Sequence, residues 1–323
     1  MTPALRVLTW HVHGSYLQYL AACGHAFLVP VRPGDSPGYA GRAGNADWPS
    51  NIVEVPAGEV AALDLDVVLY QSQRNWTVDR FDILSDRQRT AVPQVYVEHD
   101  PPREHPTDTR HPAAGSEALI VHVTPFNALM WDAGPTPATV VDHGVPDRGH
   151  RWTGELGRGL VVVNDLAARG RRLGLDVFER VRASVPLDLV GMGSEALGGL
   201  GEVPLRELPE FAARYRFLFN PIRYTSLGLA VCEAMMLGMP IVGLATTEMA
   251  TAVTNGVSGY VDTDVSRLVT AMQRLIDDHD EAARLGAGAR RAARERFSLE
   301  RFARDWDTLL RGVAAPASRR GAA

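Results

Sequence analysis

Short apolar runs alternate with helical patterns along most of the chain. The runs lack strict alternation of apolar and polar residues, which is typical of parallel strands covered on both faces. The alternation predicts doubly wound α/β sheets, and it occurs twice, on either side of a polar, glycine-containing linker at 146–158. The first series predicts strands at 6–10, 26–31, 51–55, 67–71, 95–98, 120–124 and 139–142, and helices at 15–22, 82–90 and 125–132.

The second series predicts strands at 160–163, 188–190, 217–220 and 240–244, and helices at 175–184, 207–215, 229–237, 265–278, 280–294 and 299–310. A chain of 323 residues is long enough for two domains. We expect a first domain at 1–150, a second at 151–296, a helix at 297–313 that packs back toward the first domain, and a disordered tail at 314–323. Sheets of this kind bind ligands at the carboxyl ends of their strands, so we expect a cleft between the domains.

Composition narrows the class of protein. A net charge of -5 and 22% charged residues indicate neither a disordered chain nor a nucleic-acid binder. All 33 basic residues are arginines, which excludes lysine Schiff-base chemistry and leaves arginine, histidine or backbone N–H groups to bind phosphate. Two isolated cysteines, the absence of a long apolar run and a first strand followed by polar histidines predict a cytoplasmic protein without disulfides or a membrane span. Its oligomeric state stays open.

The segment 217–264 carries the most specific pattern. A strand ends at Asn220-Pro221, and a loop containing Gly228 leads into a helix that bears Glu233. Since Gly228 has no Cβ, a phosphate can approach the backbone, and the N–H groups that open the helix attract an anion. The Glu233 carboxylate, about one turn further on, can accept hydrogen bonds from two neighbouring ribose hydroxyls. This arrangement predicts half of a nucleotide-sugar site.

This segment resembles the C-terminal domain of retaining GT-B glycosyltransferases of family 4. The resemblance implies GT-B architecture, with two Rossmann-like doubly wound domains facing a cleft, and a nucleotide-sugar donor bound by the second. The matching positions are Glu233-Ala234-Met235, Gly238, Pro240, Glu248, Asn255-Gly256 and Gly259. The implied donor-binding residues are Gly14, Ser15, Asn164, Arg169, Arg171, Gly191, Met192, Gly193, Glu202, Val203, Tyr224, Thr225, Ser226, Leu227, Gly228, Leu229 and Glu233.

Two positions depart from the family pattern. Thr225 stands where the family has the first glutamate of its E-x7-E motif, which usually holds the donor sugar. A neutral hydrogen bond stabilises a complex less than a charged one, so threonine is no simple replacement. Asp165 stands where the family has a phosphate-binding arginine, and no lysine follows it. Arg169 or Arg171 can supply that charge, because guanidinium binds diphosphate with two hydrogen bonds.

A run rich in histidine and charge, 98–111, follows a strand of the first domain and should lie at its carboxyl end. The resemblance implies that His99 reaches the transferred sugar, and we expect His99, His13 and Thr225 to be catalytic. A metal-dependent hydrolase is an alternative, but the run lacks an H-E-x-x-H spacing, so we expect no metal. The residues expected to bind an acceptor or an anion are His11, Arg103, His105, Arg110 and His111.

The sequence thus predicts a glycosyltransferase that moves a sugar from a nucleotide-diphosphate sugar to a small-molecule acceptor. The resemblance implies retention at the anomeric carbon without a metal ion, and no cofactor beyond the donor. Thr225 leaves two alternatives open, namely a nucleotide-sugar epimerase or hydrolase on the same fold, and a non-catalytic nucleotide-sugar-binding protein.

Overall fold

The computed structural model of the chain describes residues 3–12, 14–34, 38–42 and 47–315. His13 and most of the predicted tail, 316–323, lie outside the described residues. The chain divides into two compact units. Unit 1 runs to Gly144 and also includes the last helix, and unit 2 runs from Val145 to Ser298.

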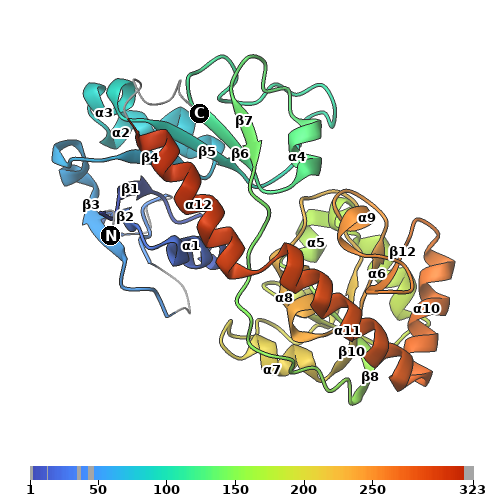
Figure 1. Cartoon of the computed structure of the whole chain (residues 1–323). Helices are drawn as coiled ribbons and strands as arrows, with labels where there is room; N and C mark the ends of the chain where they lie inside the picture. Colours follow the sequence, from blue (N-terminus) through green and yellow to red (C-terminus); the bar gives the residue numbers. More distant parts are fainter. Residues whose placement is uncertain (1–2, 13, 35–37, 43–46, 316–323) are drawn as a thin grey trace. The chain divides into compact units, whose positions relative to one another are not determined.

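Unit 1 contains a seven-stranded parallel sheet in the order β3-β2-β1-β4-β5-β6-β7 (Figure 1). The order reverses between β1 and β4, which makes the carboxyl ends of these two strands a switch point where doubly wound sheets bind ligands. Its strands are β1 (Arg6–Thr9), β2 (Ala26–Val31), β3 (Ile52–Pro56), β4 (Val67–Tyr70), β5 (Gln94–Glu98), β6 (Leu119–His122) and β7 (Ala138–Val140).

Unit 2 contains a five-stranded parallel sheet in the order β12-β11-β10-β8-β9. Here the switch point lies between β8 and β10. Its strands are β8 (Leu156–Val162), β9 (Leu187–Val190), β10 (Tyr215–Asn220), β11 (Ile241–Leu244) and β12 (Gly259–Asp262). Two doubly wound parallel sheets give the chain the predicted α/β fold class.

Helices cover the sheets. The last helix, α12 (Leu299–Ala314), packs against α1 and β4 of unit 1 (Figure 1). Unit 1 also contains α1 (Gly14–Leu20), α2 (Arg80–Ile83), α3 (Asp86–Ala91) and α4 (Pro125–Met130). Unit 2 contains α5 (Leu166–Arg169), α6 (Leu175–Arg182), α7 (Leu208–Ala213), α8 (Leu229–Leu237), α9 (Met249–Ala252), α10 (Val265–Asp277) and α11 (His279–Arg296). No helix of the described residues has both the length and the apolar character needed to cross a membrane.

The single helix predicted at 82–90 is wrong, because the structure has α2 and α3 there. Leu84 adopts an extended conformation and ends α2, and Ser85 begins α3. The Ser85 hydroxyl accepts a hydrogen bond from the Gln88 N–H, and the Gln88 side chain accepts one from the Ser85 N–H. This capping box satisfies N–H groups that would otherwise lack partners, so it favours a new helix start over a continuous helix.

The predicted linker 146–158 is wrong at its end, because Leu156 already begins β8. Glycines at 157 and 159 hid this strand, since glycine weakens a strand pattern. Gly159 is needed here, because a Cβ at this position would lie 2.3 Å from the Phe217 ring. The strand β12 and the short helices α5 and α9 were not predicted.

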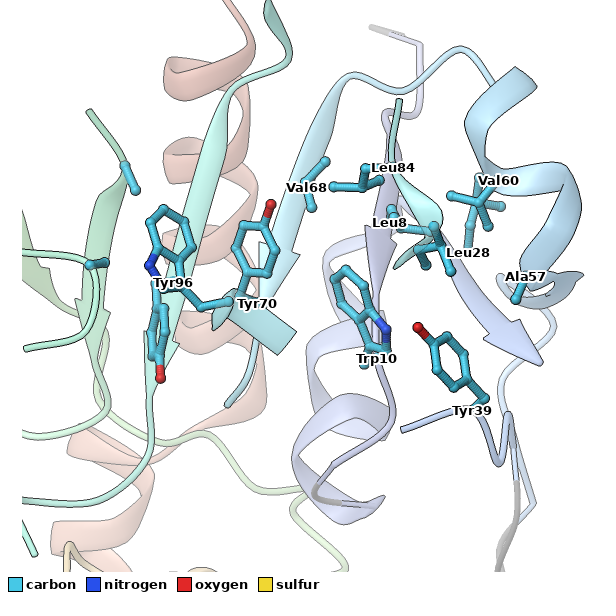
Figure 2. Packing of buried hydrophobic residues seen from close by; sticks show 14 of the residues in the cluster. Leu8, Trp10, Leu28, Tyr39, Ala57, Val60, Val68, Tyr70, Leu84 and Tyr96 are labelled. Atoms are coloured by element: carbon cyan, nitrogen blue, oxygen red, sulfur yellow. The ribbon is translucent and has the colours of Figure 1, made fainter. Parts of the chain in front are cut away.

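The core of unit 1 beneath its switch point is rich in aromatic rings. Trp10 and Tyr70 stack with their centroids 5.5 Å apart, and Trp76 contacts Tyr70 edge-on at 5.0 Å. Figure 2 shows Trp10, Tyr70 and Tyr96 standing on neighbouring strands among aliphatic side chains such as Leu8. Large buried rings stabilise the carboxyl ends of β1, β4 and β5 and so fix the loops that follow them.

Candidate functional site

The loop after β10 in unit 2 ends at Gly228, which has an extended backbone with φ -70° and ψ 139°. A Cβ added to Gly228 would have no heavy atom within 4 Å. Neither backbone conformation nor packing therefore requires glycine at this position, whereas the close approach of a ligand would. The preceding residues Ser226 and Leu227 are buried and fix the loop.

The helix α8 begins directly after Gly228 and contains nine residues. Its first N–H groups lack carbonyl acceptors from a preceding helical turn, and the helix dipole places a partial positive charge at this end. Glu233 is the one charged residue of α8, and it is half-buried, while the residues on either side of it, Cys232 and Ala234, are buried. Since Glu233 lies four residues after Leu229, it shares a helix face with the first turn.

The loops after β8 and β10 are joined by hydrogen bonds. The carbonyl oxygen of Arg172 accepts from the N–H groups of Arg223, at 3.1 Å, and of Tyr224, at 3.2 Å. Thr225, which follows Tyr224, is half-buried. The structure therefore brings the predicted residues Tyr224, Thr225 and Gly228 into one loop that is held against the arginine-rich loop.

Asp176, in the first turn of α6, pairs with two arginines. Arg223 donates to its two oxygens at 2.5 and 2.7 Å, and Arg171 donates at 2.9 Å. The hydrogen bond from Arg223 is the largest cause that lowers the pKa of the Asp176 carboxyl. Two guanidinium groups on one carboxylate leave an excess positive charge beside the switch point. Arg223 was missed from the sequence, because it lies outside the stretch that corresponds to the family's phosphate-binding arginine.

Arg169 is half-buried, at the end of α5. The loops after β8 and β9 interlock beside it. The Met192 N–H donates to Asn164 Oδ1 at 3.0 Å, and the Asp165 N–H donates to the Met192 carbonyl at 2.7 Å. Gly191 has no room for a Cβ, which would lie 2.7 Å from Asn164 Oδ1. The described structure thus uses the Asn164 side chain to shape this loop.

The turn after β9 is tied to the segment that follows it. The Gly191 N–H donates to the Gly201 carbonyl at 2.9 Å, and Gly193 adopts a left-handed conformation with φ 69°. The next residues, Glu202 and Val203, are exposed and half-buried respectively. The predicted donor-binding residues Gly191, Met192, Gly193, Glu202 and Val203 therefore lie together, after the strand next to β8.

Residues after β1 of unit 1 form a separate group. The His11 ring bonds the Gly41 carbonyl through Nδ1 at 2.8 Å, and it contacts Trp48 edge-on at 4.8 Å. Burial lowers the pKa of His11, so the ring is neutral near pH 7 and donates from Nδ1 to the carbonyl. Gly14 is the first residue of α1, and Ser15 is half-buried in its first turn.

A cavity of about 620 Å³ lies within unit 1, at the carboxyl ends of β4 and β5. Three predicted residues, His99, Arg103 and Arg110, line this cavity. The His99 ring contacts the buried Tyr16 ring edge-on at 4.6 Å. His11 and His105 are not among the lining residues, and His105 is exposed with its N–H bonded to Thr109 at 2.9 Å.

His111 lies in the interior beside this cavity. It is 2% exposed, and its Nδ1 accepts a hydrogen bond from the Ala113 N–H at 3.1 Å. Its Nε2 lies 3.3 Å from Oε2 of Glu98, which does line the cavity. The structure therefore places His111 beside a protein carboxylate. Glu98 was missed from the sequence, since it reads there as the last residue of a strand.

The metal-site alternative has no geometric counterpart in this part of the molecule. Among residues 3–12, 14–34, 38–42 and 47–315, no three or more His, Cys, Asp or Glu side chains gather as a metal ion would require.

Residues 159–278 match the family model described as glycosyl transferases group 1. Among curated proteins, none matches the chain. Among solved structures, HepE from Anabaena in complex with UDP is 15% identical, with a TM-score of 0.68 over 95% of this chain and 99% of that chain. Sucrose-phosphate synthase from Thermosynechococcus elongatus is 16% identical, with a TM-score of 0.69 over 95% and 98%.

The S. aureus protein TarM is 13% identical with a TM-score of 0.60, and the match covers 76% of this chain but 55% of TarM. At such identities the likeness concerns the fold. Together with the two parallel sheets, it places the chain in the GT-B class, with two Rossmann-like domains.

Proposed function

We propose that the protein transfers a sugar from a nucleoside-diphosphate donor, held by unit 2, to a small-molecule acceptor. The observation that carries the proposal is Gly228, where a Cβ would meet no atom although the backbone would accept one. Such a position, immediately before the start of α8, is shaped for a phosphate. The family match over 159–278 and the solved HepE complexes with UDP and UDP-glucose support a uridine diphosphate sugar as the donor.

Each part of the donor has a candidate partner in unit 2. The ribose hydroxyls would bond Glu233, and the turn from Gly191 to Val203 would cover the base. The diphosphate would accept hydrogen bonds from the N–H groups at the start of α8 and would form an ion pair with Arg171 or Arg223. These fixed donors would stabilise the negative charge that develops on the leaving diphosphate. Thr225 would contact the donor sugar. Because its hydroxyl replaces the carboxylate of the family's glutamate, the enzyme would bind a different sugar from the one that a glutamate holds.

The transfer is proposed to retain the anomeric configuration and to need no metal ion, with His99 and His13 acting near the transferred sugar. NMR of the product distinguishes retention from inversion, and activity in excess EDTA tests the metal independence. Epimerised donor or free sugar that accumulates without acceptor would instead favour an epimerase or a hydrolase. Binding without turnover would favour a non-catalytic protein.

The direct test is calorimetric titration of UDP into the native chain and a Glu233→Gln variant. The amide keeps the shape of the side chain but loses the charge that accepts ribose hydroxyls. A charged hydrogen bond contributes about 1.5–3 kcal/mol, so we expect the dissociation constant to rise roughly 10- to 100-fold. A matched control is Glu179→Gln, an exposed change on α6, which should leave UDP binding unchanged. Equal affinity of native chain and Glu233→Gln would refute the role of Glu233.

A further inference from the structure

We propose that the 620 Å³ cavity of unit 1 binds an uncharged, polyhydroxylated acceptor of the carbohydrate class. Glu98 is the residue that accepts hydrogen bonds from the hydroxyl groups of this ligand. His111 is the positioning residue for that carboxylate. The identification of the ligand as the acceptor rests on the proposed function, whereas the chemistry of the ligand rests on the cavity.

The size of the cavity suits a small sugar. Binding sites for small molecules have volumes of roughly 300–1,000 Å³, which matches the value here. The lining combines aromatic and hydrogen-bonding side chains. Trp131 and Tyr96 supply ring surface, and Trp131 is fixed by a 2.8 Å hydrogen bond from Nε1 to the Asp100 carbonyl. Sugar rings present C–H groups and hydroxyls together, and such a lining matches both.

The charges of the lining cancel. The lining contains the arginines Arg74, Arg103 and Arg110 and the carboxylates of Glu98, Asp100 and Glu104. Arg103 is paired with Asp100, and Arg74 lies 3.2 Å from the buried carboxylate of Asp79. An anionic ligand would have to compete with these carboxylates for the arginines and would be repelled by the charge of Glu98. The cavity therefore favours a neutral ligand, in contrast to the anion that the arginines suggested from the sequence.

Glu98 is the deepest charged group of the lining, with its side chain 11% exposed. Its Oε1 accepts from the Asp100 N–H at 2.9 Å, and its Oε2 faces His111. Each carboxylate oxygen has more than one acceptor site, so each can accept a further hydroxyl proton. Gln71 also lines the cavity, and its amide is fixed by bonds from its N–H groups to Thr9 and Trp10.

The His111 ring lies beside Glu98, with Nε2 3.3 Å from Oε2. Because its Nδ1 accepts from Ala113, a neutral ring carries its proton on Nε2, on the side of Oε2. Edge-on contacts with Tyr96 at 4.6 Å and Trp131 at 5.0 Å hold the ring plane. The buried ring beside Oε2, together with the Asp100 N–H on Oε1, restricts the orientation of the carboxylate, so hydroxyls approach a preformed acceptor pair.

Ligand-observed NMR with the whole chain tests the proposal, with glucose, sucrose and myo-inositol as neutral probes and glucose 6-phosphate as the anionic probe. We expect at least one neutral probe to bind more tightly than glucose 6-phosphate. We expect Glu98→Gln to weaken that binding about tenfold, since a charged acceptor is lost. Preference for glucose 6-phosphate, binding of no neutral probe, or unchanged binding by Glu98→Gln would overturn the proposal.

Two histidine variants separate positioning from folding. His111→Gln keeps an N–H directed toward Glu98 and should retain binding within about threefold, whereas His111→Leu should lose it about tenfold. Thermal unfolding measured alongside must show both variants folded, and equal binding losses in two folded variants would overturn the positioning role. UDP titration separates the two proposals. If UDP binds but no neutral probe does, this inference alone is refuted. If a neutral probe binds but UDP does not, the proposed function alone is refuted.

Discussion

Arg223 donates two hydrogen bonds to Asp176, at 2.5 and 2.7 Å, and so ties the loop after β10 to the first turn of α6. The same carboxylate accepts from Arg171 at 2.9 Å. Arg223 is the more enclosed of the two, with its side chain 30% exposed against 76% for Arg171. Arg223 is held at both oxygens of the carboxylate, so under the proposed function it is the better organised of the two arginines for a diphosphate.

We therefore predict that Arg223→Gln weakens UDP binding about tenfold, because a charge-assisted hydrogen bond is lost. The free energy of unfolding should change by less than about 1 kcal/mol, since partly exposed ion pairs contribute little. Calorimetric titration and urea unfolding measure the two quantities. Arg171→Gln is the matched control on the same carboxylate and should have the smaller effect. A larger loss in Arg171→Gln would reverse the assignment.

Gly228→Ala separates ligand approach from folding. Its backbone conformation suits alanine and its Cβ would enter open space, so the free energy of unfolding should fall by less than about 1 kcal/mol. The methyl group would occupy the space proposed for a phosphate, so UDP binding should weaken at least about tenfold. Gly58→Ala, also with no atom near its Cβ, is the control for both measurements. Native-like UDP affinity in Gly228→Ala would show that no phosphate approaches there.

Gly174→Ala should differ from Gly228→Ala by destabilising the fold. Gly174 adopts a left-handed conformation with φ 83°, and a Cβ would lie 1.9 Å from the Pro221 carbonyl oxygen. Both strain and clash destabilise the folded state, so we expect a loss of more than about 2 kcal/mol in the free energy of unfolding. UDP binding should weaken as well, because Pro221 begins the loop that leads to Gly228. Urea unfolding that matches the native chain would contradict this close contact.

Much of the fold follows from the sequence, since buried parallel strands and amphipathic helices carry strong local patterns. Every strand of both predicted series is present, and all except the strand at 26–31 have ends that differ from the prediction. Local signals that compete with the pattern caused the errors. The capping box at Ser85 divides a predicted helix, and Gly159 disguises a strand because the neighbouring Phe217 ring needs its missing side chain.

The local placement of candidate residues was predictable where spacing along one element decides it, as for Gly228 before α8 and Glu233 on α8. It was not predictable where contacts join distant segments. Arg223 meets Asp176 across 47 positions, and no local pattern marks either residue. Glu98 and His111 likewise meet only because a loop folds back onto the end of β5. The roles of the predicted catalytic residues, His13, His99 and Thr225, stay predictions.

The last prediction concerns the buried His122, on β6, and the pH dependence of stability. Burial, followed by the neighbouring His111, lowers the pKa of His122 to about 4. An unfolded histidine has a pKa of about 6.5, so below that value the unfolded chain gains a proton that the folded chain does not. Stability is therefore unaffected above about pH 6.5 and falls progressively as the pH drops toward 4.

At pH 5 this linkage is expected to cost about 2 kcal/mol of the free energy of unfolding. His122→Phe fills similar space and cannot titrate. Its free energy of unfolding should therefore fall less between pH 7 and pH 5 than that of the native chain, even if its stability at pH 7 is lower. Urea unfolding of both proteins at pH 7, 6 and 5 measures the slope. His105→Phe, a change of an exposed histidine, should keep the native slope. A slope equally steep in His122→Phe would assign the acid sensitivity to other groups, such as His25, whose pKa is also lowered by burial.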